Sequence, residues 1–134
     1  MFKHMFHQVN LIQKGLDVAS LRQEVYSHNI ANVDTPGYKT KHVEFEHMLR
    51  NAMEKKSMTG TVTHVNHFKI GVNDPLAVQP AIVTENFHTM RLDGNNVDID
   101  REMTGLAINT ITYNTLANQM NSEISRLRTA ISGN

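Results

Sequence analysis

The sequence has little of what catalytic, secreted or membrane proteins depend on. None of its 134 residues is cysteine, which excludes disulfides and thiol chemistry. No apolar run approaches the roughly 18 residues of a membrane span, and the first residues lack the continuous apolar core of a secretory signal. If the protein works outside the cytoplasm, we expect another export route to carry it. The 13 basic and 13 acidic residues balance without clustering, so we expect no nucleic-acid partner.

Catalytic and metal-binding patterns are also missing. The chain has eight histidines, but His4 with His7, and His64 with His67, form pairs, whereas transition-metal sites usually need about three or four ligands. The sequence contains neither an HExxH motif nor a glycine-rich phosphate loop. We therefore expect no enzyme, no cofactor and no metal site.

The first 33 residues predict one long helix. Prolines are scarce and fall only in the middle of the chain, so both ends are free to be helical. Apolar residues recur at alternating spacings of three and four, interrupted only by Gln23. This spacing is that of a heptad seam. The seam consists of Met5, Val9, Ile12, Leu16, Ala19 and Tyr26, extended by Phe2, Ile30 and Val33. A second apolar row needs a further covering surface: Phe6, Leu11, Val18, Leu21 and Val25.

Residues 97–132 predict a second long helix. Acidic residues crowd its first turn and arginines lie near its end, an order that complements the helix dipole. Its seam consists of Met103, Leu106, Tyr113, Ala117, Met120, Ile124, Leu127 and Ile131, with Thr110 between them. Two such helices most simply pair as an antiparallel coiled-coil hairpin. We predict a mainly α fold whose discontinuous helical core comprises residues 1–33 and 97–134.

The middle of the chain predicts two smaller parts. Residues 34–56 read as a turn followed by a short amphipathic helix over 43–55. Residues 57–96 read as an extended, β-like arm with short strands at 61–65, 68–72 and 81–84 and a loop at 93–96. This arm has too little apolar material for its own core, so we expect it to be ordered only against neighbours.

The outer face of the second helix is unusual because it lacks charge. No charged residue occurs from Met103 to Ser122, where threonine, asparagine, glutamine and serine take the place of the usual Glu and Lys. A neutral hydrogen-bonding face suits a surface that becomes buried, since an unpaired buried charge is expensive. The pattern indicates polymerisation.

The two helices and the arm meet at a stretch that stops the first helix. Asn29 and Asn32 are predicted to cap its end, with asparagine also tolerating the left-handed conformation. Thr35 before proline is pushed toward extended geometry, and Pro36-Gly37 fits the centre of a type II turn. We predict that this stretch, residues 29–39, is a joint that holds a fixed angle between the first helix and the arm. We expect it to matter for assembly more than for the stability of the monomer.

This stretch, NIANVDTPGYK at residues 29–39, resembles the signature of the flagellar axial proteins, the rod and hook subunits of the bacterial flagellum. The segments GNNVDIDRE at 94–102 and LRTAI at 127–131 resemble the end of a proximal rod subunit. The rod protein FlgC remains an alternative, although it typically carries an alanine-glutamine-arginine-alanine-tyrosine run where this chain reads ITYNT at 111–115. A two-helix module that grips one partner helix is the other alternative.

The resemblance implies a structural subunit of the proximal rod, the hollow periplasmic shaft that transmits torque and lets export substrates pass. The implied assembly motif consists of Asn29, Ile30, Ala31, Asn32, Thr35, Pro36, Gly37 and Tyr38. The implied partners are copies of this chain, rod proteins of the FlgC and FlgF types, the MS ring with its adaptor FliE, and the flagellar type III export apparatus. The resemblance also implies export without a cleaved signal peptide.

Overall fold

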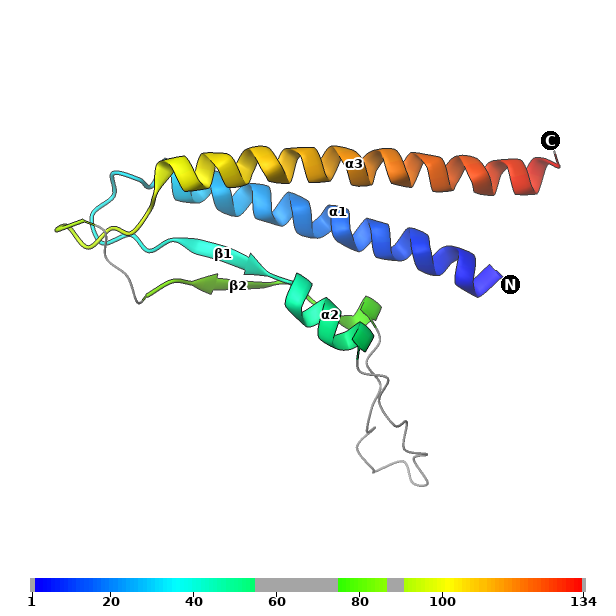
Figure 1. The fold of residues 1–134 in the computed structure, drawn as a ribbon, viewed down its shortest axis with the longest axis horizontal. Coiled ribbons are helices and arrows are strands. Elements are labelled where there is room, and N and C mark those ends of the chain that lie inside the picture. Colours follow the sequence, from blue (N-terminus) through cyan, green and yellow to red (C-terminus); the bar gives the residue numbers. More distant parts are fainter. Residues whose placement is uncertain (1, 55–74, 87–90, 134) are drawn as a thin grey trace, which may run out of the picture.

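The computed structural model describes residues 2–54, 75–86 and 91–133, with side chains described from residue 6 onward (Figure 1). Its elements follow in the order α1 (Phe2–Ala31), β1 (Lys41–Glu44), α2 (Glu46–Glu54), the single 3-10 turn η1 (Pro75–Ala77), β2 (Ala81–Thr84) and α3 (Ile99–Ser132). The predicted strands at 61–65 and 68–72 lie outside the described residues. No helix in the described part is long and apolar enough to cross a membrane.

The two long helices lie side by side and run in opposite directions, so both chain ends lie at the same end of the molecule (Figure 1). This confirms the predicted pairing of the terminal helices. The start of α3 is capped by Asp98, whose side chain accepts hydrogen bonds from the backbone N–H groups of Asp100 and Arg101. Its end is closed by Gly133 in the left-handed conformation, with φ of 71°. Both ends of α3 therefore lie within two residues of the predicted ones.

The face of α3 that packs on α1 differs from the predicted seam in its first half. Glu102 and Asn109 are buried there, whereas Met103 is 55% exposed and Tyr113 is 38% exposed. Glycines explain the shift, because they let the helices come close on a neighbouring row. A Cβ added at Gly105 would lie 2.7 Å from the ring of Tyr26.

The remaining seam residues divide between buried and exposed positions. On α1, Ala19 is buried and the others are partly buried: Val9, Ile12, Leu16 and Tyr26. On α3, partly buried members are Leu106, Ala117, Met120 and Leu127, whereas Ile124 and Ile131 are exposed. The side chain of Met5 lies outside the described part. Burial is therefore greatest where the C-terminal half of α1 packs on the N-terminal half of α3, and it is least toward the two chain ends.

The second apolar row of α1 is covered from Val18 onward by a two-stranded antiparallel sheet, whereas Phe6 is exposed. Strands β1 and β2 pair with Lys41 opposite Thr84 and Glu44 opposite Ala81. Val18 and Val25 of α1 form the core with Val43 and Phe45, and the flanking side chains are Leu21, Leu49 and Val78. Each large apolar side chain buried in this way contributes about 1.5–3 kcal/mol. The fold thus has three layers, with α1 between α3 and the hairpin.

The strand β1 corrects the predicted extent of the short helix. The periodicity from Phe45 onward predicts a helix over 43–55, but α2 begins at Glu46. Val43 instead pairs with Ile82 in the sheet and is buried against α1. A strand of four residues is too short to show its period beside a stronger helical pattern. The predicted strand at 81–84 is confirmed as β2.

Candidate functional site

The C-terminal end of α1 is stopped by Asn32, as predicted. Its amide donates a hydrogen bond to the carbonyl of His28 over 2.8 Å, and its oxygen accepts one from the Thr35 hydroxyl over 3.1 Å. No residue other than glycine has positive φ in the described part of the chain, so Asn32 acts through its side chain and not through the left-handed conformation. The last carbonyls of the helix thereby gain partners.

Asn29, in contrast, does not cap the helix. It is fully buried and uses its whole hydrogen-bonding capacity across three elements. Its amide donates to the Lys41 carbonyl (2.7 Å) and to Glu102 Oε2 (2.8 Å), while its oxygen accepts from the Lys41 N–H and the Tyr38 hydroxyl, both at 3.1 Å. Asn29 therefore ties α1 to β1 and to the first turn of α3.

The chain between α1 and β1 forms the predicted turn at Pro36-Gly37. The N–H of Tyr38 donates to the Thr35 carbonyl over 3.2 Å, and Gly37 has φ of 72°. This positive angle at the second central position is the requirement of a type II turn. The Gly37 N–H also donates to the carbonyl of Asp93 over 2.9 Å, which joins the turn to the loop before α3.

Two asparagines from that loop complete the joint. The Asn95 amide lies 3.0, 3.0 and 2.9 Å from the carbonyl oxygens of Asn32, Val33 and Thr35, and its own oxygen accepts from the Val97 N–H over 2.7 Å. Asn95 is fully buried. Its side chain therefore replaces the backbone partners that the end of α1 lacks.

Asn96 makes the matching contact on the hairpin. Its oxygen accepts from the Thr40 N–H over 2.7 Å, and its amide donates to the Glu85 carbonyl over 2.8 Å. Thr40 directly precedes β1 and Glu85 directly follows β2, so Asn96 joins the two strands at one end of the sheet. Sequence reasoning missed Asn95 and Asn96 as site residues, because a Gly-Asn-Asn run alone indicates only a loop.

Charged side chains close the outer surface of the joint. Arg91 donates to the Val33 carbonyl over 3.1 Å and pairs with Asp93 at 3.1 Å, and the Lys39 ammonium donates to the Gly94 carbonyl over 2.7 Å. These groups are partly exposed, so each contributes little, typically less than about 1 kcal/mol. The buried amides carry the connection.

The joint holds one buried carboxylate. Burial raises the pKa of Glu102, and Asp98 and Glu85 raise it further, while the hydrogen bond from Asn29 and the charge of Arg101 lower it. Burial, together with the negative charge of Glu102, also raises the pKa of the Tyr38 hydroxyl. The polar contacts at Glu102 do not fully offset its loss of solvation.

The other residues of the predicted motif lie at the surface of the joint. Ile30 and Tyr38 are partly buried, and the exposed members are Ala31, Thr35, Pro36 and Gly37. The motif thus has an inner part that holds the elements together and an outer part that a neighbouring molecule could contact.

Most of the uncharged stretch of α3 lies on the surface of the described part, although Asn109 within it is buried against α1. Its apolar side chains Ile108 and Ile111 are 60% and 67% exposed, alongside exposed threonines and asparagines. An exposed row of this kind, without charge, is typical of an interaction surface.

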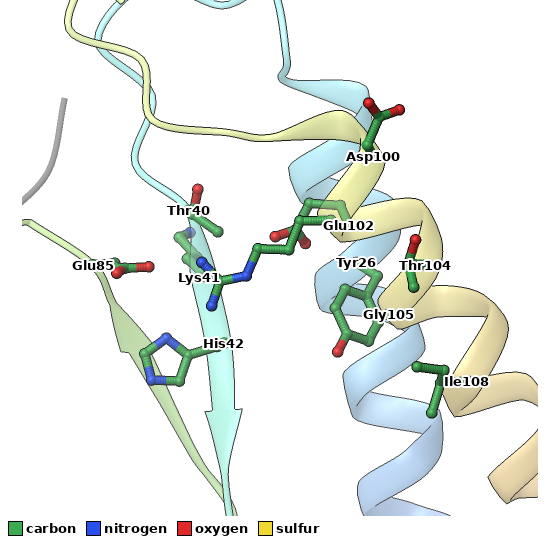
Figure 2. Close-up of a pocket in the computed structure, with 11 residues that line it drawn as sticks. Tyr26, Thr40, Lys41, His42, Glu85, Asp100, Glu102, Thr104, Gly105 and Ile108 are labelled. Carbon is green, nitrogen blue, oxygen red and sulfur yellow. The ribbon is translucent and has the colours of Figure 1, made fainter. Parts of the chain in front are cut away.

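A cleft of about 700 Å³ opens between α3 and β1, with Tyr26 beside it (Figure 2). Within the described residues, no group of three His, Cys, Asp or Glu side chains could hold a metal ion. His4, His64 and His67 lie outside the described side chains. In the joint as a whole, hydrogen bonds from buried amides fix elements from both ends of the chain relative to one another.

Comparison with known proteins gives consistent matches. Residues 13–39 match the family model described as flagella basal body rod protein. The chain is 35% identical over 122 residues to the flagellar basal body rod protein FlgB of Bacillus subtilis, which covers 91% of both chains. It is 39% identical to FlgB of Borreliella burgdorferi and 41% identical to FlgB of Borrelia hermsii, each over 117 residues, covering 82% of this chain and 84% of the relative.

Proposed function

This chain belongs to the flagellar basal body rod protein family, and we propose that its asparagine-rich joint sets the geometry with which it enters the rod. Like its FlgB relatives, it is a structural subunit of the proximal rod and not an enzyme. The observation that carries this function is the 35% identity to a named rod protein across 91% of the chain. The relatives described above all carry the FlgB name, so nothing in them favours FlgC or a two-helix binding module.

The joint supports a mechanical role. A subunit that transmits torque needs a fixed angle between its parts, and buried hydrogen bonds with little slack provide that stiffness. Asn29 and Asn95 are both fully buried and together join α1, β1 and the loop before α3. We assign the paired helices to the wall of the tube and the joint to the fixed angle from which the arm extends. On this proposal residues 1–33 and 97–134 form the helical core, residues 34–56 carry the turn and the short helix, and residues 57–96 carry the arm, whose β2 and Asn95 pack on the other two parts.

The uncharged face of α3 supports a contact with the next subunit. Rod subunits assemble with one another, and a tube built from repeated heterologous contacts needs a surface that tolerates burial. Ile108 and Ile111 are exposed in the single chain and would lose water in such a contact. The threonine and asparagine side chains beside them can pair locally when buried.

The basal body is the site of action that the family supports, and we propose a finer placement within it. The subunit would stand at the base of the periplasmic rod, in contact with the MS ring and its adaptor FliE and with rod proteins of the FlgC and FlgF types. Delivery would use the flagellar type III export apparatus without a cleaved signal. The resemblance of residues 29–39 and 94–102 to proximal rod subunits supports both these partners and this export route.

Deletion of the gene followed by electron microscopy of isolated basal bodies tests the function. We expect the deletion strain to lack rods and motility, and the wild-type gene to restore both. An epitope tag on the restored protein would be found in purified basal bodies. Complete basal bodies in the deletion strain would refute the assignment.

A further inference from the structure

Four close contacts between α1 and α3 lie on one row of α3, and this row is mostly not apolar. In order along α3 the contacts are Glu102 with Asn29, Gly105 with Tyr26, Asn109 with Ala19, and Leu116 with Gly15. Their spacing keeps them on one side of the helix. Figure 2 shows the ring of Tyr26 beside Gly105. The first three α3 residues of this row, which we call the polar row, are polar or glycine.

The apolar row that the sequence predicts as the seam lies one residue further along α3. Met103 and Thr110 directly follow Glu102 and Asn109. One residue corresponds to about 100° around a helix, so the two rows form neighbouring faces. Met103 is 55% exposed and Thr110 is exposed, so α1 covers the polar row and leaves part of the apolar row open. A rotation of α3 by one residue about its axis would exchange the two rows against α1.

Asn109 shows that burial of the polar row is not explained by apolar packing alone. This residue is buried, and its amide donates a hydrogen bond to the Ala19 carbonyl over 2.8 Å. A carbonyl can only accept, so the amide nitrogen must face it. Asn109 Oδ1 is then left without a hydrogen-bond partner among the described residues. A buried acceptor without a partner is unfavourable, so the single chain bears a cost at this contact.

We propose that α3 can pack on α1 by either row, and that Asn109 and Gly105 select the polar row seen here. Gly105 permits this row, since a Cβ there would lie 2.7 Å from the ring of Tyr26. Asn109 favours it through a directional bond to the backbone of α1. The selected row fixes the direction in which Ile108 and Ile111 point. The inference rests on the proposed function in this respect, because these two side chains form the proposed contact with the next subunit.

Disulfide trapping in the full-length protein measures which row faces α1, since the chain has no cysteine of its own. Gly15→Cys with Leu116→Cys reports the polar row, because a Cβ at Gly15 would lie 3.2 Å from the Leu116 side chain. Gly15→Cys with Ala117→Cys reports the apolar row. Asn109→Ala should raise the rate of the second disulfide relative to the first at least about fivefold, the effect of one net hydrogen bond.

Thr110→Leu tests the selection from the other row. Thr110 is exposed, so leucine should leave the helices folded while it strengthens the apolar row, and the relative rate should rise again. Asn10→Ala, at an exposed position of α1, is the control that should not change it. A wild-type relative rate in a folded Asn109→Ala protein would refute the selection. If circular dichroism shows that this variant does not fold, an unchanged rate in Thr110→Leu refutes it instead.

Incorporation of the cysteine-free variants into basal bodies tests the consequence for assembly. We expect Asn109→Ala to be incorporated at least about fivefold less than the wild-type protein, and Asn10→Ala to be incorporated normally. A shifted relative rate together with normal incorporation of Asn109→Ala would refute the link between the selected row and assembly. Wild-type protein absent from basal bodies would refute the function itself, whereas the trapping rates would still decide which row faces α1.

Discussion

Replacing Asn29 with alanine gives a quantitative test of the joint. The substitution removes four hydrogen bonds at a fully buried position. A net bond contributes about 0.5–1.5 kcal/mol, and each buried group left without a partner costs about 1–3 kcal/mol. Water entering the vacated space satisfies part of this loss, so we expect a decrease of about 3–5 kcal/mol in the free energy of unfolding. Such a change lowers Tm by roughly 10 °C or more in a domain of this size.

Urea unfolding followed by circular dichroism measures the effect. Asn10→Ala is the control, since Asn10 is exposed on the same helix and alanine is the better helix former. Asn29→Asp is a second test, because aspartate keeps the shape but cannot donate to the Lys41 carbonyl and places a carboxylate beside Glu102. A loss below about 1 kcal/mol for Asn29→Ala would refute the reasoning that the buried amide holds the joint. The sequence alone predicts that Asn29 serves assembly more than stability, whereas these contacts predict that it serves both.

Three further predictions follow from the structure. Gly37→Val should prevent rod formation as seen by electron microscopy, because the positive φ at this position costs valine roughly 1–2 kcal/mol. Gly37→Asn should have a milder effect, and normal rods with valine would exclude a role for the turn. Asn114→Lys combined with Asn118→Lys should leave Tm unchanged, since both side chains are exposed, but should abolish incorporation into basal bodies; unchanged incorporation would discard the uncharged face as a contact. The raised pKa of Glu102 means that the folded state binds the proton more tightly than the unfolded state. Stability should therefore decrease as pH rises from about 4.5 through the folded pKa, and Glu102→Gln should remove this decrease in a pH series of Tm values; a parallel decrease in the variant would contradict the assignment.

The long helices and the turn could be predicted because their causes are local. Heptad spacing, the cap at Asp98 and the glycine at 133 act within a few residues of one another. The same holds for Pro36-Gly37, where the sequence predicts the positive φ that the structure has at Gly37. The pairing of the two long helices could be predicted from their apolar seams, since each helix needs a partner to cover its seam.

The contacts that could not be predicted join residues far apart in the chain. The Asn29 amide donates a hydrogen bond to Glu102, 73 positions later in the chain. Neither asparagine nor glutamate indicates from the sequence that it will be buried with such a partner. The contact face of α3 likewise depends on Gly105 admitting the ring of Tyr26, which a periodicity of apolar residues does not register. Strand β1 forms because α1 offers a second apolar row, so its existence depends on tertiary structure.

In this fold buried amides hold the elements together, whereas many large apolar side chains remain exposed for contact with a neighbour. In the described part of the chain, large apolar side chains are exposed more often than they are buried, and the exposed ones include Ile108, Ile111 and Ile131 on α3. The most completely buried side chains are instead the amides Asn29 and Asn95. Hydrogen bonds are directional, so buried amides fix angles between elements in a way that a small apolar core does not. The apolar surface left on α3 is then available to bury against a neighbour, which links assembly to the geometry of the joint: a subunit whose joint is loosened presents the same surface in the wrong orientation.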